Sequence, residues 1–203
     1  MKKTVWDRIS PMYDAFEKLF NREVFDAIGE RAAEYVGPGD DVLECACGTG
    51  AISFFLAKRC RSLTATDMSG PMLAQCERKL KNCYNVRFRK ADLTALKVRD
   101  GRFDAVVAGN VIHLLDDPKA AVGELLRVCK PGGKVIIPTY ISIFRKNHEG
   151  IAAKAIGAVG IEFKTEFDLE SYRRFFTDLG FPDAEINVVN GRTPCAIAVI
   201  TKK

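Results

Sequence analysis

The feature that most constrains the fold is a regular alternation of short apolar runs with segments of helical spacing. Alternation of strand and helix in this way predicts a parallel sheet with helices on both faces and right-handed crossovers. One helix is expected directly after Gly50. The predicted strands are residues 41–45, 62–66, 85–89, 103–108 and 134–137, and the later predicted helices are residues 71–80 and 118–129.

Local signals set the ends of the predicted helices. Asp117 and Pro118 supply an N-cap and a proline at the first helical position, and the Pro-Gly-Gly run at residues 131–133 is expected to end that helix. Ser10 and Pro11 predict the start of the N-terminal helix in the same way.

The 203 residues are expected to form a single domain. An apolar stripe near the N-terminus predicts one helix, or two helices broken near Asn21. Near the C-terminus, Asp168 should cap a helix that Gly180 ends, and strands at 184–189 and 195–201 should follow. The expected parts are an N-terminal helical cap (1–36), a core (37–138), a mobile insert (139–167), and a C-terminal helix with closing strands (168–203).

Composition excludes several classes of protein. Hydrophobic residues make up 47% and charged residues 28%, which excludes collagen, a disordered tail and a coiled coil. No stretch approaches the roughly 18 apolar residues of a membrane span, and no signal peptide is expected. The seven scattered cysteines predict free thiols in a cytoplasmic protein. Cys45 and Cys47 are interpreted as small side chains beside a turn, with a metal or redox site as the alternative.

The charge balance is mildly basic, with 31 Lys and Arg against 26 Asp and Glu, a net charge of +5. Basic residues gather at 77–102. We interpret them as a solvated face, with contact to an anionic substrate, a lipid surface or RNA as the alternative. Few aromatic residues lie among them, which argues against stacking on single-stranded nucleic acid. No nucleic-acid partner is expected, and peripheral lipid contact stays open.

The most informative stretch is VLECACGTG at residues 42–50. A buried strand runs into a loop of small residues and then a helix, which lets a ligand approach the backbone closely. Carboxylates follow three predicted strands, at Glu44, Asp67 and Asp92, where an open α/β sheet binds its ligands. With no lysine or arginine in the loop, this pattern favours a ligand with amines and hydroxyls and no phosphate. Residues 48–53 read GxGxxS and therefore do not fully match the GxGxxG fingerprint of dinucleotide-binding proteins.

As a set, these motifs resemble the class I S-adenosylmethionine-dependent methyltransferases, from Trp6 to Thr201. VLECACGTG resembles motif I, and WDRISPMYD is similar to the opening of the quinone-biosynthesis and phospholipid-amine branches. The other matching motifs are LTATDMSGPML, KADLTAL, FDAVVAGNVIHLLDDP and LLRVCKPGGKVII. The resemblance implies an α/β, Rossmann-like sheet of seven mostly parallel strands, the last one antiparallel, with helices on both faces. It also implies S-adenosylmethionine as cofactor, bound by the core (37–138), and S-adenosylhomocysteine as its product. The mobile insert (139–167) is then expected to lie over the acceptor site.

The resemblance implies roles for the residues at matching positions. Ala46 stands where the family has the first glycine of motif I, so either no positive φ is needed there or the loop is shifted. Glu44 is one methylene longer than the usual acid. The implied contacts are Tyr13 closing over the cofactor, Glu44 near the methionine amino group, the backbone of Ala46, Gly48 and Gly50 along the methionine moiety, Asp67 at both ribose hydroxyls, Met68 against the adenine, Asp92 and Leu93 at the adenine edge, and Asn110 beside the methionine end.

Methyl transfer from a sulfonium is an in-line displacement, so alignment supplies much of the rate and a catalytic base is optional. His113 is the candidate for a base or substrate contact, with support of its loop as the alternative. His148 is interpreted as a surface residue or a substrate contact. The N-terminal helices and the insert should form the acceptor pocket. Their large apolar residues are interpreted either as an apolar wall of this pocket or as part of the hydrophobic core. These residues are Trp6, Tyr13, Phe16, Phe20, Tyr140, Ile143, Phe144, Ile161 and Phe163.

The sequence therefore predicts a methyltransferase acting on a small molecule without a metal, as a monomer or homodimer. The loop after the fourth strand reads GNVIH, which differs from the NPPY-type motif of enzymes that methylate nucleobase amines. One alternative is an NAD-dependent oxidoreductase, which Ser53, Asp92 and the lack of a Tyr-x-x-x-Lys pair count against. The other is a non-catalytic S-adenosylmethionine-binding sensor, which the unusual Ala46 keeps open.

Overall fold

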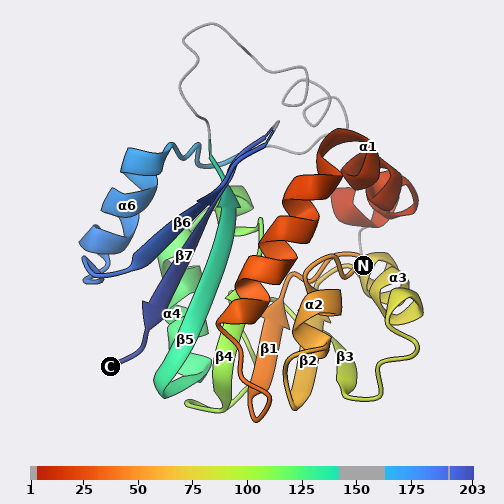
Figure 1. The fold of residues 1–203 in the computed structure, drawn as a ribbon, viewed down its shortest axis with the longest axis horizontal. Helices are drawn as coiled ribbons and strands as arrows, with labels where there is room; N and C mark the ends of the chain where they lie inside the picture. Colours follow the sequence, from red (N-terminus) through yellow and green to blue (C-terminus); the bar gives the residue numbers. More distant parts are fainter. Residues whose placement is uncertain (1–3, 142–162, 192) are drawn as a thin grey trace, which may run out of the picture.

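The computed structural model describes residues 4–141, 163–191 and 193–203, without the side chains of residues 14–22. A seven-stranded sheet crosses the molecule in the order β3-β2-β1-β4-β5-β7-β6 (Figure 1). Its neighbours from β3 to β5 are parallel, whereas β7 is antiparallel to both β5 and β6. The predicted fold class is confirmed. The strands are β1 (Asp41–Cys45), β2 (Ser62–Asp67), β3 (Val86–Lys90), β4 (Phe103–Ala108), β5 (Cys129–Tyr140), β6 (Glu185–Val189) and β7 (Cys195–Thr201).

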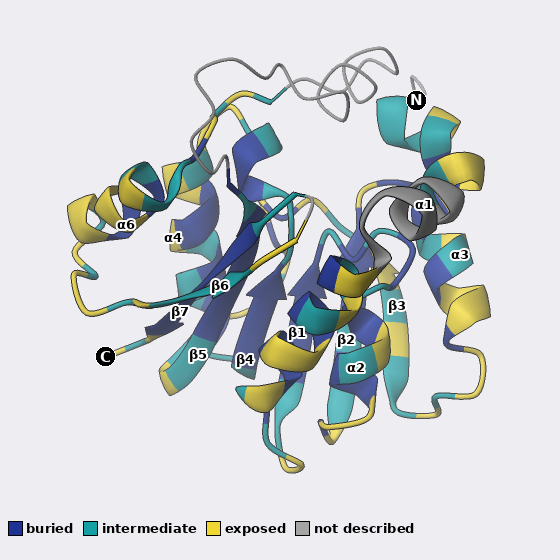
Figure 2. Ribbon diagram, turned by 45° about the horizontal axis from the view of Figure 1, so that its top comes forward, coloured by how far each residue is buried: buried dark blue, intermediate teal, exposed yellow. Residues whose placement is uncertain are grey.

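Helices cover both faces of the sheet, and the central strands are buried between them (Figure 2). One hydrophobic core joins the sheet to α1, α2 and α3, and a second joins its other face to α4 and α6. The helices are α1 (Val5–Glu34), α2 (Ser53–Ala57), α3 (Gly70–Lys79), α4 (Pro118–Val128) and α6 (Leu169–Asp178), with a short 3₁₀ helix η1 (Ile112–Leu114) after β4.

Parallel register brings the carboxyl ends of the central strands to one edge. Cys45 at the end of β1 lies beside Thr66 of β2 and Ala108 of β4. The N–H of Cys47 also donates to the Thr66 carbonyl at 2.9 Å. The loops after β1, β2 and β4 therefore leave the sheet together, at the edge where ligands bind in open α/β folds.

The start of α1 differs from the prediction. The N-cap is Thr4, not Ser10, and Thr4 forms a capping box with Asp7. Pro11 lies inside the helix, where it cannot donate to the carbonyl of Asp7. The Ser10 hydroxyl donates to that carbonyl instead, at 3.4 Å. The chain therefore forms one helix here, and the alternative of two helices broken near Asn21 is wrong.

The other helix ends follow the local signals, with one exception. Asp117 caps α4, Asp168 caps α6, and Gly180 follows α6 with a φ of 87°. The exception is the end of α4, which comes at Val128, before the Pro-Gly-Gly run. Residues 131–133 lie instead within β5, where the pairing with β4 shifts register.

Much of the predicted insert lies outside the described residues. β5 continues to Tyr140, so the expected boundary at residue 139 falls inside a strand. The predicted mobile segment, with Ile143, Phe144, His148 and Ile161, falls on residues 142–162, which the structure does not describe. In the described ranges, no helix combines the length and apolar character needed to span a membrane.

Candidate functional site

The loop after β1 is built from left-handed backbone. Residues 46, 48 and 50 have φ angles of 53°, 54° and 88°. A Cβ on Gly48 would meet nothing within 4 Å, so the backbone there is open on that side. A Cβ on Gly50 would lie 2.7 Å from the Cys76 Sγ on α3. Gly48 thus leaves room for a ligand, and Gly50 allows the loop to pack against α3.

Ala46 adopts the conformation that glycine usually supplies. Its positive φ answers the question that the sequence left open, because the backbone here does need the left-handed region. The suggestion that residue 46 needs no positive φ is therefore wrong. A left-handed L-residue crowds its Cβ against the following carbonyl, which costs about 1–2 kcal/mol. The loop keeps its shape in spite of this strain.

Asp67, at the end of β2, links the loop to α3. Its Oδ2 accepts from the Gly48 N–H at 2.9 Å, and its Oδ1 accepts from the Ser69 N–H at 2.8 Å. Burial raises the pKa of this carboxyl, and the two N–H donors oppose that rise. The carboxylate is thus fixed beside the loop. The next residue, Met68, is exposed.

Glu44 lies almost fully buried beneath the loop. Burial raises the pKa of its carboxyl well above the ordinary value, Cys76 and Asp67 add repulsion, and contacts from Ser53 at the start of α2 oppose the rise. The Oε2 atom has no hydrogen-bond partner. A buried carboxyl with a free acceptor atom is suited to meet a donor that arrives with a ligand.

Asp92 and Leu93 lie in the loop after β3. The Asp92 Oδ1 accepts from the N–H and hydroxyl of Thr94, at 2.9 and 2.7 Å, and the residue is exposed. Leu93 is buried. The N–H of Ala91 donates to the Asp67 carbonyl at 3.1 Å, which holds this loop beside the end of β2. The structure therefore gathers Glu44, Asp67 and Asp92 along one edge.

The first turns of α1 are tied to the same region. The Ser69 hydroxyl donates to Asp7 Oδ1 at 2.7 Å, and the Gln75 side chain donates to the Ser10 carbonyl. Tyr13 lies in this part of α1, with its ring edge-on to Trp6 at 6.3 Å.

The sequence analysis missed three polar residues of this edge. Asp7 completes the capping box of α1 and Ser69 is the N-cap of α3, and these capping patterns are the signals that could have found them. Lys79 Nζ donates to Thr49 Oγ1 at 3.4 Å. That lysine comes from α3, so inspection of the loop sequence alone could not reveal it.

His113 lies on η1 among aromatic rings. Its ring centroid is 4.9 Å from Phe163 and 6.0 Å from Tyr140 at the end of β5, and Tyr140 lies edge-on to Phe25 of α1 at 6.1 Å. The histidine is buried, which lowers the pKa of its imidazole to about 4. Its Nδ1 has no hydrogen-bond partner. Of these four rings, the sequence analysis did not single out Phe25.

Asn110 is the other non-glycine residue with a positive φ in the described chain, at 51°. Its N–H donates to the Pro138 carbonyl of β5 at 2.8 Å. Its side-chain oxygen accepts from the Cys195 thiol at 3.8 Å. The amide oxygen is therefore directed toward β7, and a role at the methionine end of the cofactor stays a prediction.

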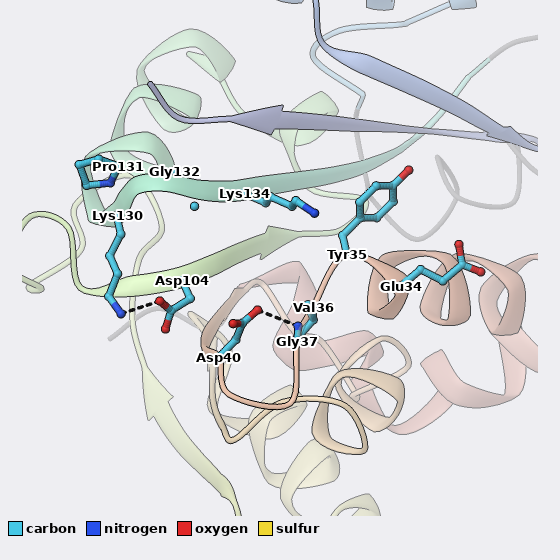
Figure 3. Close-up of a pocket in the computed structure, with 11 residues that line it drawn as sticks. Glu34, Tyr35, Val36, Gly37, Asp40, Asp104, Lys130, Pro131, Gly132 and Lys134 are labelled. Atoms are coloured by element: carbon cyan, nitrogen blue, oxygen red, sulfur yellow. Dashed lines mark hydrogen bonds and ion pairs between the residues drawn. The ribbon is translucent and has the colours of Figure 1, made fainter.

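A hollow of about 500 Å³ lies elsewhere, beside the start of β4 and β5 (Figure 3). Three of its charged groups already have partners: Lys130 pairs with Asp104 at 2.6 Å, and Asp40 accepts from the Gly37 N–H at 2.7 Å. It contains none of the predicted site residues. We therefore assign the candidate site to the carboxyl edge, not to this hollow.

The residues at the carboxyl edge fit S-adenosylmethionine in chemical type. The unpaired oxygen of Glu44 suits an ammonium group, Asp67 offers acceptors for hydroxyls, and the open backbone at Gly48 admits close approach. Across the described ranges, no group of three or more His, Cys, Asp or Glu residues is placed to hold a metal ion.

Comparison with known proteins supports the same assignment. Residues 43–137 match a family model described as a methyltransferase domain. A demethylmenaquinone methyltransferase from Clavibacter sepedonicus is 35% identical over 136 residues, which cover 66% of this chain and 55% of that protein. One from Renibacterium salmoninarum is 28% identical over 214 residues, which cover 92% and 86%. The chain thus spans little more than half the length of the first relative and most of the second.

Solved structures show the same fold. The DhpI–SAH complex superposes with a TM-score of 0.71 at 23% identity, covering 97% of this chain and 93% of that one. A chain of the Haloferax volcanii complex between the Trm112 methyltransferase activator and a methyltransferase gives 0.73 at 17% identity, with both chains fully covered.

The sheet has an antiparallel β7 between β5 and β6, and a glycine-containing loop follows β1. These features define a Rossmann-like methyltransferase fold. Residues 43–137 thus match a methyltransferase domain, and the relatives and solved structures to which the chain is similar support a class I S-adenosylmethionine-dependent methyltransferase. The predicted family, fold and cofactor are confirmed.

Proposed function

We propose that this protein transfers a methyl group from S-adenosylmethionine to a small aromatic acceptor related to a reduced quinone. The observation that carries the proposal is the meeting of Glu44, Asp67 and the left-handed loop at the carboxyl edge. When bound, S-adenosylmethionine would supply an activated methyl group on a sulfonium. The chain's own part is to bind, align and exclude water.

We propose for these residues the cofactor roles that the resemblance implies. Asp67 would accept from the ribose hydroxyls, and Glu44 would meet the methionine ammonium with its free oxygen. The backbone of the loop at residues 46, 48 and 50 would line the methionine moiety. Met68, Asp92 and Leu93 would surround the adenine, Asn110 would lie by the methionine end, and Tyr13 would close from α1.

Two observations support the acceptor class. The matched relatives from Clavibacter and Renibacterium are named demethylmenaquinone methyltransferases. The edge of the sheet next to the loop also carries an aromatic wall of Phe25, Tyr140, Phe163 and the neutral His113. Such a wall suits a flat, apolar ring.

We also propose a cytoplasmic protein that acts as a monomer or homodimer without nucleic acid. All seven cysteines are free thiols, which supports a reducing compartment.

Calorimetric titration with S-adenosylmethionine and S-adenosylhomocysteine tests the cofactor site. We expect Asp67→Ala to weaken binding by about 1–3 kcal/mol, because the ribose hydroxyls lose their acceptor. Asp183→Ala, which removes an exposed carboxylate before β6, is the matched control and should bind like the wild type. Equal affinity in Asp67→Ala and the control would contradict the assigned site, and no binding to the wild type would contradict the function.

A further inference from the structure

The aromatic wall contains one polar atom that the protein itself leaves unused. His113 is 3% exposed, yet its Nδ1 has no hydrogen-bond partner. The rings around it come from separate parts of the chain: Tyr140 from β5, Phe163 from the segment before α6, and Phe25 from α1. A buried polar atom without a partner is costly, so a native structure keeps one only where something else compensates.

The backbone holds this histidine in place. The His113 carbonyl accepts from the N–H groups of Lys164 and Thr165, at 2.9 and 3.1 Å. η1 begins at Ile112, shortly after β4 ends at Ala108, and Ala108 lies beside the end of β1. His113 is therefore anchored at the same edge as the loop assigned to the cofactor, while its ring nitrogen stays unpaired.

We propose that His113 Nδ1 accepts a hydrogen bond from a hydroxyl on an aromatic methyl acceptor, which Tyr140 and Phe163 hold against it. This inference rests on the proposed function and assigns to His113 Nδ1 the recognition of a hydroxyl on that acceptor. The imidazole suits this role because it is neutral near pH 7, as a buried histidine with its pKa lowered to about 4 must be. With the proton on Nε2, Nδ1 is an acceptor.

The same nitrogen can take the hydroxyl proton during the transfer. As a ring carbon next to the hydroxyl bonds to the methyl group that S-adenosylmethionine would supply, the electron pair of the broken sulfur–methyl bond would stay with the cofactor. The hydroxyl oxygen feeds electrons into the ring, becomes strongly acidic and passes its proton to Nδ1, which leaves a ring ketone. The ring then loses its C–H proton to water while Nδ1 returns its proton to the oxygen. One proton is released overall.

Binding of naphthol and its methyl ether to the protein saturated with S-adenosylhomocysteine tests this inference without turnover. Both probes fit an aromatic wall, and only naphthol can donate to Nδ1. We expect the wild type to bind naphthol about tenfold more tightly than the ether, the typical effect of one buried hydrogen bond. His113→Phe keeps an aromatic ring without the nitrogen, and it should bind both probes within about twofold.

Two further variants separate recognition from packing. His113→Asn carries an amide oxygen as an acceptor and should restore part of the preference for naphthol. Phe163→Leu removes a wall ring but leaves Nδ1, so it should weaken both probes and preserve their ratio. The measured quantity is the ratio of the dissociation constants of the methyl ether and naphthol. This inference is overturned if that ratio is near one in the wild type, if it is unchanged in His113→Phe, or if neither probe binds. The cofactor assignment would still stand in each of these cases. A wild type that does not bind S-adenosylhomocysteine overturns the proposed function and this inference with it.

Discussion

At the scale of single residues, Ala46 in the loop after β1 adopts a backbone conformation that its side chain disfavours. Ala46 has a φ of 53°, where glycine would fit without strain. We expect Ala46→Gly to raise the free energy of unfolding by about 0.5–1 kcal/mol, because relief of the left-handed strain exceeds the entropy that glycine adds to the unfolded chain. Urea unfolding monitored by circular dichroism measures the change.

The same chemical change elsewhere serves as the control. Ala120 lies in the first turn of α4 and is exposed, so Ala120→Gly should destabilise the protein by up to about 1 kcal/mol. If both glycine variants lower stability, the strain assigned to residue 46 is absent.

The candidate site could be predicted from the sequence only in part. The acids at the ends of β1, β2 and β3 were visible as residues that follow apolar runs, and the structure gathers them. The unpaired Nδ1 of His113 was not visible, because its burial depends on Phe163 and Tyr140, which come from later elements. The direction of the Asn110 amide likewise depends on Cys195, far along the chain.

At the scale of elements, periodicity and capping signals predicted most of the secondary structure. The errors arose where two signals compete. Ser10-Pro11 has the pattern of a helix start, but the capping box of Thr4 and Asp7 begins α1 earlier. The glycines at residues 132 and 133 suggested a turn, but they lie in β5, where the Gly132 N–H donates to the Lys202 carbonyl at 2.7 Å and the Gly133 carbonyl accepts from the Lys202 N–H at 2.9 Å. Local sequence does not contain these longer-range contacts.

The attachment of α6 to the sheet gives a prediction at this scale. Tyr172 is fully buried, and its hydroxyl donates to the Ile137 carbonyl of β5 at 2.5 Å. We expect Tyr172→Phe to lower the free energy of unfolding by about 1–2 kcal/mol, since a buried hydrogen bond is lost while the ring packing stays. Tyr84→Phe is the matched control, because Tyr84 is 99% exposed and should have no measurable effect. Equal stability of both variants in chemical denaturation would show that this hydroxyl does not anchor α6.

At the scale of the whole molecule, the candidate site is a place where stability is reduced. Ala46 is strained, Glu44 and Asp67 are buried acids close to each other, and Nδ1 of His113 is unpaired. At the opposite edge of the sheet, by contrast, Asp104 and Lys130 form an ion pair. Conflicts of this kind concentrate where a ligand is to bind, because the ligand then relieves them.

The pH dependence of the free energy of unfolding tests whether Glu44 reduces stability at the candidate site. Its carboxyl ionises near 4.5 when unfolded, but burial raises its pKa well above that value in the folded protein. The folded state therefore retains a proton that the unfolded state has lost, so stability falls as pH rises from the unfolded pKa toward the folded one. Glu44→Gln removes this contribution. Without cofactor, the variant should gain stability relative to the wild type as pH rises above the unfolded value of 4.5.

Bound cofactor should change that result. An ammonium beside Glu44 would lower the pKa of the carboxyl, so saturation with S-adenosylhomocysteine should flatten the pH dependence of the wild type and leave Glu44→Gln almost unchanged. Binding should also release a proton, which calorimetry detects as a heat that depends on the ionisation enthalpy of the buffer. Glu44→Gln should show no such dependence. Parallel pH profiles for the two proteins without cofactor, or the same proton release in both, would show that Glu44 is already ionised in the folded protein and does not couple stability to cofactor binding.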